Sequence, residues 1–593
     1  MSEYIIRLRH WVDTSEKSLS CLLWLSGAFG LILGSNGAFG ILGESWEAAI
    51  STAQVLNGLV RFPAGSLGYD YHASVFSITN YIACLFLAIT DSETASSVLL
   101  SALLGLLAMQ ALAMSLFVVI RNAFLATLIA TLLGIINYPG AGIHYPIIFV
   151  GTGHTYAKAG LAFALYAVLL IGLSRFRLGF FLCGLALSLH PSWGLWLNAC
   201  LILTLCIRFK SFQAIFTRDN IACYAAGIAI SVGLYAWHRN AFPITQTALL
   251  IDPAEVRNLF LYYIRYWDGH RYADLTAGAL AKALPAALLT LALLKLILKK
   301  TPSRSSENLL FSFLLCSSAL SVLLVFVPYL DAGVFPEFFI AVMPGRFINL
   351  AIFLCIPLAA AYLILSLDSG NQRAVLQAAV LGGLAIVITA WDMTIRMMMV
   401  SGAALGVGVI AIMRRRQMEN SLSIDQFRLR NYVVCAFLAA LAAFLTAYAA
   451  YKLSAMKEQN HGITITRPVH GSILTTVETA YAQISTRTAT ITPYLDGFPY
   501  VGGFSLVALN ELVNDIYGVS IKSIPSADLD LHGGEISTKD YETLWTSRSC
   551  SDWVTLAKKY GFGLIVVPPQ ILLQLQRYDD DPAWNKYVPS CQP

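Results

Sequence analysis

Apolar runs of about 20 residues recur along this chain from Ser18 to Leu453, and they limit what it can fold into. A helix of about 20 apolar residues crosses the roughly 30 Å hydrocarbon core of a bilayer. Over the 593-residue chain, 57% of the residues are hydrophobic and 12% are charged. The pattern predicts an α-helical polytopic membrane protein. In a membrane protein, basic residues in the loops set the orientation of the spans, so we interpret the net charge of +5 in this way rather than as a sign of nucleic-acid binding.

The positions of lysine and arginine predict how the spans are oriented, because cytoplasmic loops are enriched in both. The basic connections lie at residues 175–177, 208–218, 299–304 and 414–430. The connections that carry acids lie at residues 44–70, 91–93, 252–274, 331–337 and 392–396. We therefore place the N-terminus and the basic connections in the cytoplasm and the acid-bearing connections outside.

The number of crossings follows from this alternation. The segments from residue 178 to residue 453 are predicted to cross the membrane in turn. Before residue 178 there is one apolar run too many for both the N-terminus and Arg175 to lie in the cytoplasm. The run at 75–89 is short and contains Asn80, so we predict that it is re-entrant or lies along the outer surface. About 13 crossings remain, with the C-terminus outside.

The chain divides into three regions. Residues 1–18 are basic and amphipathic, which predicts a helix on the cytoplasmic membrane face. Residues 19–453 form the predicted transmembrane domain, with an outer loop at 43–74. Residues 456–593 mix strand-like and helix-like runs, a pattern typical of a small α/β domain, and this domain is expected outside the cytoplasm.

Two sequence features are specific to these regions. Cys550 and Cys591 are the two cysteines of the polar C-terminal region, and they are expected to form a disulfide if that region lies outside the cytoplasm. Residues 179–207 lie between two basic connections, so they are predicted to go out and back as two short segments. Pro191 places the turn directly after His190, because proline blocks continuation of the first helix.

Acidic residues are concentrated directly after the first apolar run. Glu44 and Glu47 are three residues apart, on one face of a predicted helix at the membrane surface. They suit two interpretations: solvated acids at a helix N-terminus, favoured by the helix dipole, or a catalytic base.

Basic residues on the predicted outer side suit a phosphate-bearing amphiphile. Arginine binds phosphate through two parallel hydrogen bonds, and lysine and histidine add positive charge. The alternatives are capping or packing roles for the histidines, and a snorkelling role for Arg346. The tyrosines and tryptophan of 252–274 are expected at the membrane interface. The candidate residues are His154, Lys158, His190, Arg265 and Arg346.

The order of these features resembles the GT-C superfamily of integral membrane glycosyltransferases, which use polyprenyl-phosphate-linked sugars outside the cytoplasm. The first acidic loop of that superfamily is matched by GESWEAAISTAQVLNGLVRFP, and a later outer loop by GTGHTYAKAGLAFAL. Its broken helix is matched by GLALSLHPSWGL, and its late arginine by MPGRFINLAIFLCIPLAAAY. The resemblance covers most of the chain as an architecture, through short motifs, and a soluble outer C-terminal domain is common there too.

The resemblance implies a glycosyltransferase in a bacterial cytoplasmic membrane. Glu44 or Glu47 would deprotonate an acceptor hydroxyl on a lipid, glycan or protein, and the anomeric centre would invert. His190 and Arg346 would hold the donor phosphate, helped by His154, Lys158 or Arg265.

The chain also departs from that superfamily. Here Glu44-Ser-Trp-Glu47 replaces adjacent aspartate and glutamate, and His154 stands where a second acid is common. These residues make a poor set of ligands for a divalent cation, so neither a metal nor another cofactor is expected. The alternatives are a glycolipid transporter or flippase, favoured by the broken 179–207 pair, and a glycan polymerase or ligase.

Overall fold

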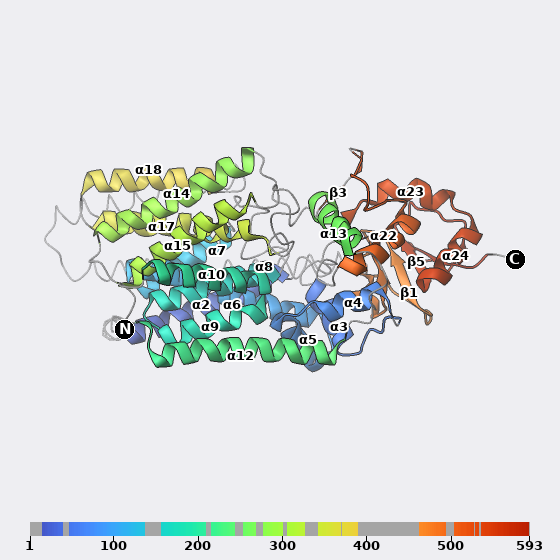
Figure 1. Cartoon of the computed structure of the whole chain (residues 1–593), viewed down its shortest axis with the longest axis horizontal. Helices are drawn as coiled ribbons and strands as arrows, with labels where there is room; N and C mark the ends of the chain where they lie inside the picture. The colour runs from blue at the N-terminus through green and yellow to red at the C-terminus, as the bar shows by residue number, and fades with distance from the viewer. Residues whose placement is uncertain are drawn as a thin grey trace.

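The chain forms a helical bundle at one end and a smaller α/β domain at the other in a computed structural model (Figure 1). The structure describes residues 15–38, 47–63, 65–136, 156–208, 215–243, 253–267, 277–300, 305–326, 342–368, 371–389, 462–493, 503–526, 528–529, 531–532 and 535–591. Residues 1–14 of the predicted N-terminal helix 1–18 and the predicted spans 397–413 and 431–453 therefore lie outside the described residues.

Apolar helices pack side by side in the bundle. They are α2 (Ser15–Ala38), α6 (Glu93–Ile120), α7 (Ala123–Ile136), α8 (Tyr156–Gly172), α9 (Phe176–Leu189), α10 (Pro191–Ile207), α12 (Arg218–Ala241), α14 (Ala277–Lys300), α15 (Ser305–Leu324), α17 (Asn349–Asp368) and α18 (Gln372–Thr389). Three shorter helices, α3 (Glu47–Leu56), α4 (Leu67–Ser74) and α5 (Ile78–Thr90), lie between the bundle and the α/β domain (Figure 1).

The described helices are compatible with a membrane protein. Five of them are long and apolar enough to cross a bilayer, and a sixth span results if α4 and α5, bent by 106°, are counted together. Six further apolar helices are shorter, at 10–17 residues. The predicted helical fold with apolar spans is thus confirmed at this level, whereas the count of about 13 crossings stays a prediction.

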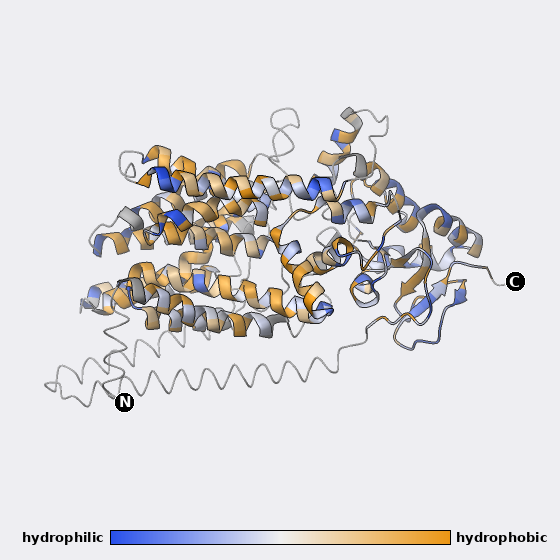
Figure 2. Ribbon diagram, turned by 90° about the horizontal axis from the view of Figure 1, so that it is seen from below, coloured by the Kyte–Doolittle hydropathy of each residue, from blue (hydrophilic) through white to orange (hydrophobic). Residues whose placement is uncertain are grey.

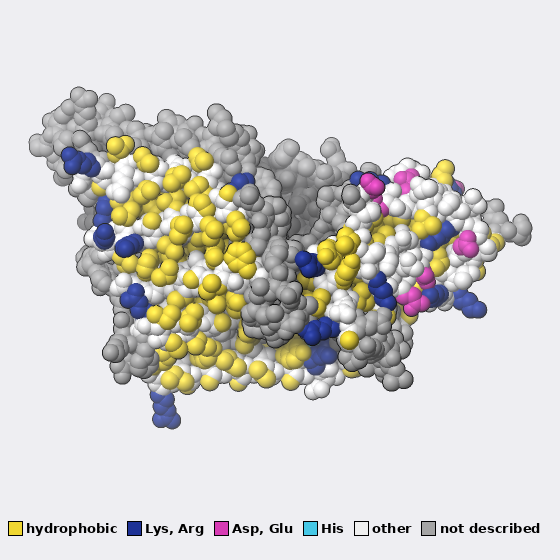
Figure 3. All heavy atoms as spheres, turned by 45° about the horizontal axis from the view of Figure 1, so that its top comes forward, with side chains coloured by type: hydrophobic (Ala, Val, Ile, Leu, Met, Phe, Trp, Pro, Cys, Tyr) yellow, Lys and Arg dark blue, Asp and Glu magenta, His cyan; other side chains and the backbone are white. Residues whose placement is uncertain are grey.

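The outer surface of the bundle is apolar over the face shown in Figure 3, whereas the acidic side chains in that view lie over the C-terminal domain. Hydropathy follows the same division, with apolar residues concentrated along the bundle helices (Figure 2). Helix α12 is an example, because only 17% of its candidate span is buried and Trp237 is 52% exposed. A helix exposed in this way suits contact with lipid, where its backbone hydrogen bonds are satisfied internally.

Close packing of α2 against α6 depends on glycine. A Cβ atom added to Gly105 would lie 2.1 Å from the carbonyl oxygen of Gly30, and one added to Gly34 would lie 2.1 Å from the carbonyl oxygen of Ser101. The two backbones therefore approach more closely than any larger residue allows, as is common between membrane helices.

We expect Gly105→Ala to lower the thermal unfolding midpoint of the detergent-solubilised protein, because overpacking costs about 1–3 kcal/mol. Gly233→Ala is the matched control, since Gly233 lies on α12 with no atom within 4 Å of an added Cβ. Equal midpoints for the two variants would contradict the packing described here.

Several helix ends meet at one end of the bundle. The hydroxyl of Ser77, before α5, donates to the carbonyl oxygen of Leu189 at 2.6 Å. The Tyr156 hydroxyl at the start of α8 donates to Asn80 Oδ1 at 2.6 Å. His238 Nε2, near the end of α12, lies 2.8 Å from the carbonyl oxygen of Ala73. The side of the bundle that carries the short helices is therefore formed by the starts of α8 and α10 and by the ends of α9 and α12.

The basic connections lie at the opposite end of the same helices. Arg175 and Arg177 lie between α8 and α9, and Arg208 follows α10. Arg177 forms an ion pair with Asp219 in the first turn of α12. The described basic residues of these connections, at 175–177, 208 and 218, are thus gathered at the end of the bundle away from the C-terminal domain.

Helix α5 occupies the position of the predicted 75–89 segment. It begins beside the α9–α10 break, through Ser77, and ends at Asp91, which is paired with Arg487 of the C-terminal domain. Both ends of this 13-residue helix therefore lie at the same end of the bundle. That the segment is re-entrant or lies along the outer surface stays a prediction, since α4 and α5 together also have the length and composition of one bent span.

The C-terminal domain contains a five-stranded sheet with strand order β2-β1-β5-β7-β6. The strands are β1 (Ser472–Thr475), β2 (Thr490–Ile491), β5 (Phe562–Val567), β6 (Gln576–Arg577) and β7 (Asn585–Val588). β1 is parallel to β2 and β5, whereas β7 is antiparallel to β5 and β6. In register, Leu474 pairs with Ile565 and Ile565 with Tyr587. The apolar run of β5 is central and buried, as expected for a strand covered on both faces.

Helices and a second small sheet complete this domain. They are α21 (Ala482–Thr486), α22 (Gly503–Tyr517), α23 (Thr538–Ser547), α24 (Cys550–Tyr560), β3 (Leu531–His532) and β4 (Glu535–Ile536). Ser549 and Asp552 form a capping box that starts α24, and Gly561 ends it with a φ of 73°. The predicted mix of strands and helices is confirmed, as is the Cys550–Cys591 disulfide, which joins the start of α24 to the chain end with 5.5 Å between Cα atoms.

The segment 253–267 belongs to the core of this domain, which corrects one prediction. Helix α13 (Pro253–Tyr262) continues into a π-helical turn, η2 (Tyr263–Trp267). Tyr263 and Trp267 are 0% and 1% exposed in the core shared with α22, and Trp267 Nε1 donates to the carbonyl oxygen of Ser523 at 3.1 Å. These two aromatic residues are therefore not at a membrane interface, because protein contacts cover them.

A buried lysine stabilises the edge of the sheet. The Lys586 side chain is 0% exposed, and its Nζ contacts Asp579 at 3.0 Å and Asp581 at 2.7 Å. Burial alone would raise the pKa of Asp581, but hydrogen bonds from Lys586 and from the backbone N–H of Ala583 lower that pKa below its ordinary value.

We expect Lys586→Met to reduce the protection of β5 and β7 amides from hydrogen exchange, because breaking a buried ion pair costs about 3–5 kcal/mol. Because the pKa of Asp581 is lower in the folded protein than in the unfolded chain, where it is about 3.9, the charged carboxylate stabilises the fold above about pH 3.9. That stabilisation is lost as the pH falls through the folded-state pKa. The wild-type protection should therefore decline below about pH 4, and the variant should show less of this decline. Lys558→Met, at an exposed position on α24, is the control, and equal protection in both variants would contradict the ion-pair role.

Candidate functional site

Three of the predicted site residues lie on neighbouring elements at the end of the bundle that carries the C-terminal domain. Lys158 is in the first turn of α8, His190 separates α9 from α10, and Arg346 lies in a 3₁₀ turn, η4 (Pro344–Ile348), that leads into α17. Their exposed fractions are 7%, 8% and 5% respectively.

The break at His190 follows from local sequence. Pro191 is the first residue of α10 and has no N–H to donate, so α9 ends at Leu189. His190 has an extended backbone, and its Nδ1 accepts a hydrogen bond from the Trp193 N–H at 3.4 Å. The imidazole therefore caps α10, which fixes its orientation at the break. The predicted turn at His190 is confirmed.

Helix α8 approaches this break through Gly160. A Cβ atom added to Gly160 would lie 2.7 Å from Trp193 Cδ1 and 3.0 Å from His190 Cβ. Lys158 lies two residues earlier on the same helix. The glycine thus allows the first turns of α8 to lie directly against the start of α10.

The turn that carries Arg346 is held against α10 by two hydrogen bonds. The carbonyl oxygen of Val342 accepts from the Ser192 hydroxyl and from Trp196 Nε1, each at 2.8 Å. The Phe347 ring packs on Trp193 with 5.0 Å between centroids. The elements that carry His190 and Arg346 are therefore joined on both sides of Arg346.

This arrangement has a chemical consequence. Lys158, His190 and Arg346 place basic side chains on neighbouring elements, and side chains of these types can donate hydrogen bonds to an anionic group. Arginine is the side chain best matched to a phosphate, through two parallel hydrogen bonds.

The remaining predicted residues have other placements. Arg265 is exposed in η2, with its guanidinium 5.5 Å from the centroid of the Tyr266 ring, and η2 packs on the C-terminal domain. It is thus placed with that domain rather than with the three helix ends. Glu44 and His154 lie outside the described residues. Glu47 begins α3, but its side chain lies outside them too.

Polar residues of the short helices belong to the same end of the bundle but were not among the predicted site residues. Asp70 and His72 on α4 are 0% and 5% exposed, and Thr52 Oγ1 of α3 lies 2.9 Å from His72 Nδ1. Asn80 is fully buried and links α5 to α8. In the sequence these polar side chains lie within or beside apolar runs, and a buried polar group needs a hydrogen-bond partner. That position is the feature of the sequence that could have identified them.

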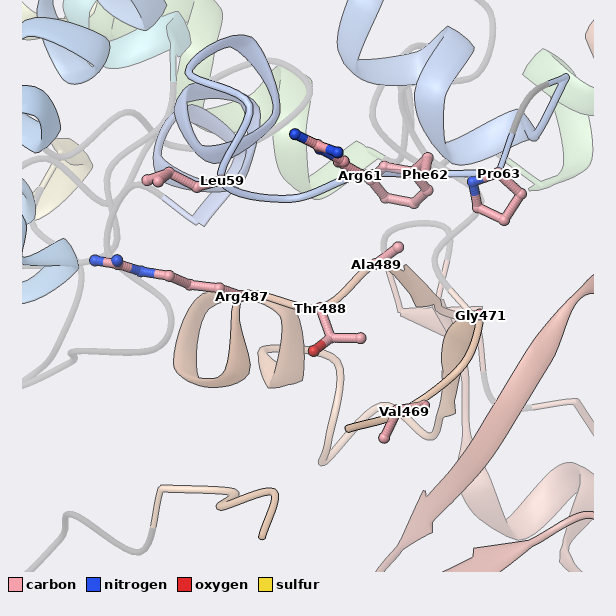
Figure 4. A pocket seen from close by; sticks show the side chains of 9 residues that line it. All are labelled: Leu59, Arg61, Phe62, Pro63, Val469, Gly471, Arg487, Thr488 and Ala489. Carbon is pink, nitrogen blue, oxygen red and sulfur yellow. The ribbon is translucent and has the colours of Figure 1, made fainter. Parts of the chain in front are cut away.

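An open pocket of about 500 Å³ lies where the connection after α3 meets the C-terminal domain (Figure 4). Its lining residues are Leu59, Arg61, Phe62, Pro63, Val469, Gly471, Arg487, Thr488 and Ala489. In Figure 4 the connection faces the loop after α21 across the hollow, and each side contributes one arginine. The pocket is therefore polar, and it is shared by the two parts of the molecule.

Comparison with models of known protein families, with curated proteins and with solved structures finds no match for this chain. Among the residues that the structure describes, no three histidine, cysteine, aspartate or glutamate side chains form a group that would hold a metal ion. Glu44 and His154 lie outside that set, so the expectation of no cofactor stays a prediction.

We expect the double variant Ser192→Ala, Trp196→Phe to speed hydrogen exchange at residues 345–348, because η4 loses both hydrogen bonds that hold it against α10. Thr204→Ala is the matched control on α10, since the Thr204 hydroxyl donates within its own helix to the carbonyl oxygen of Cys200. Unchanged exchange at 345–348 in the double variant would contradict this account of η4.

Proposed function

We propose that this chain is a membrane glycosyltransferase. It would transfer a sugar from a polyprenyl-phosphate-linked donor to an acceptor hydroxyl on the outer face of a bacterial cytoplasmic membrane. The observation that carries the proposal is the placement of buried Lys158, His190 and Arg346 on contacting helix ends.

Donor binding follows from this placement. The phosphate of the donor lies near Arg346 and His190, with Lys158 adding positive charge, while the polyprenyl chain extends along apolar helices. The attraction between basic side chains and a phosphate is strong in an apolar environment, because solvent screening is weak there. The cations also stabilise the polyprenyl phosphate as it leaves.

The transfer step needs a base close to the acceptor. The carboxylate of Glu44 or Glu47 takes the proton of the acceptor hydroxyl. The hydroxyl oxygen attacks the anomeric carbon, and the bond from that carbon to the phosphate oxygen breaks with its electron pair on the phosphate. One displacement inverts the anomeric centre. The C-terminal domain lies at the same end of the bundle and presents the acceptor.

One observation favours a second function, a glycolipid flippase. Broken helices are common where transporters bind their substrates, and this chain has a break between α9 and α10 and a 106° bend between α4 and α5. The same cations would then hold a phosphate during movement between leaflets, without bond cleavage.

The test is transfer of radiolabelled sugar from polyprenyl-phosphate donors by the purified protein in lipid vesicles. We expect Glu44→Gln or Glu47→Gln to lower kcat by about 10²–10⁴-fold while donor binding is retained, because only the base is lost. Arg346→Ala should weaken donor binding instead, because the bidentate phosphate contact is lost.

Lys300→Ala is the control for removal of a helix cation. Lys300 Nζ contacts Ser366 Oγ at 2.7 Å, near the ends of α14 and α17 that lie away from the site. This variant should keep wild-type turnover. If the wild-type protein transfers no sugar from any donor but moves a lipid-linked glycan between leaflets, the transferase proposal fails and the flippase takes its place.

A further inference from the structure

The C-terminal domain docks on α3 through its short helix α21. Gln483 Nε2 donates to the carbonyl oxygen of Ser51 at 3.1 Å. In the other direction, Gln54 Nε2 of α3 donates to the carbonyl oxygen of Ile484 at 3.2 Å. The two amides hold α3 and α21 together, and both contacts join residues more than 400 positions apart.

Arg487 directly follows α21 and extends this contact to the start of α6. Its φ of 51° ends α21 in the left-handed conformation. Its guanidinium binds Glu93 through two hydrogen bonds, Nε to Oε1 at 2.6 Å and Nη2 to Oε2 at 3.2 Å. Nη1 also pairs with Asp91 at 2.8 Å. One arginine of the C-terminal domain thus holds both acids of the α5–α6 corner.

Gln54 joins the two contacts into one network. Its Nε2 also donates to Glu93 Oε1 at 2.9 Å, so Glu93 accepts from Gln54 and from Arg487. The Glu93 side chain is 17% exposed, which limits the solvent screening of its pair with Arg487. We refer to Gln54, Glu93 and Arg487 as the latch.

We propose that the latch is a positioning device for the transfer reaction: it fixes α3, and with it the acid at the start of that helix, relative to the cations at the bundle end. Arg487 and Gln54 are positioning residues, because they act through α3. This inference rests on the proposed function and deepens it, since it assigns the C-terminal domain a part in catalysis.

The length of α3 explains why it needs such support. It has 10 residues, and isolated helices shorter than about 12–15 residues are marginal in water. At about 1.5 Å per residue, Gln54 lies roughly 10 Å along the axis from Glu47, so a shift at the latch moves the start of the helix as well. A displacement of about 1 Å at a catalytic group can cost about 100-fold in rate.

The test compares Arg487→Ala with Lys559→Ala in the full-length protein. Lys559 pairs with Glu511 and Asp515, each at 2.6 Å, so its removal also breaks two ion pairs of the C-terminal domain, but none to α3. We expect Arg487→Ala to speed hydrogen exchange at residues 48–56 about tenfold, the change expected for loss of a hydrogen bond to a charged group. Lys559→Ala should leave that exchange unchanged.

Turnover separates positioning from general damage. In Arg487→Ala we expect kcat to fall about 10- to 100-fold with little change in the KM for the donor, because the base moves while the phosphate-binding cations stay in place. Arg487→Lys should recover part of the loss, since it keeps the charge but not the paired hydrogen bonds. Lys559→Ala should keep wild-type kcat.

The outcomes that overturn the latch differ from those that overturn the transferase. Unchanged exchange at 48–56 in Arg487→Ala overturns the latch, whether or not the protein transfers sugar. Faster exchange with an unchanged kcat overturns its role in positioning. An inactive wild-type protein overturns the proposed function, and with it the positioning role, while the exchange measurement still reports whether the C-terminal domain holds α3.

Discussion

The break between α9 and α10 is the constraint on which the rest of this end of the molecule depends. Backbone groups freed at a helix break inside an apolar bundle must find partners, since water is scarce there. The Ser77 hydroxyl supplies one partner to Leu189, and His190 supplies another to Trp193. Satisfying the break therefore brings the start of α5 to it and orients an imidazole in the process.

Other elements gather around this break because small residues allow it. Gly160 lets α8 lie against His190 and Trp193, and η4 is held by the two hydrogen bonds to Val342. These contacts place α8 and η4 beside the α9–α10 break, and each of the three carries one basic residue. The proposed phosphate-bearing donor would bind among these basic side chains.

The C-terminal domain is integrated with the bundle rather than attached as a separate unit. It receives α13 and η2 into its core through Trp267, and it reaches back to α3 and α6 through Gln483 and Arg487. The two parts are thus joined at several points of the chain. A rearrangement of this domain would therefore also displace the short helices beside the bundle.

The sequence by itself determined what is local. The length of the apolar runs indicated spanning helices, Pro191 located the break, and two cysteines in a polar region indicated their disulfide. Tertiary structure decided the rest. Whether Arg265 joins the cations or the C-terminal domain, and whether Glu93 meets Arg487, 394 positions later, depends on packing between distant segments. No period or spacing encodes such a pairing, because it arises only once both partners are folded.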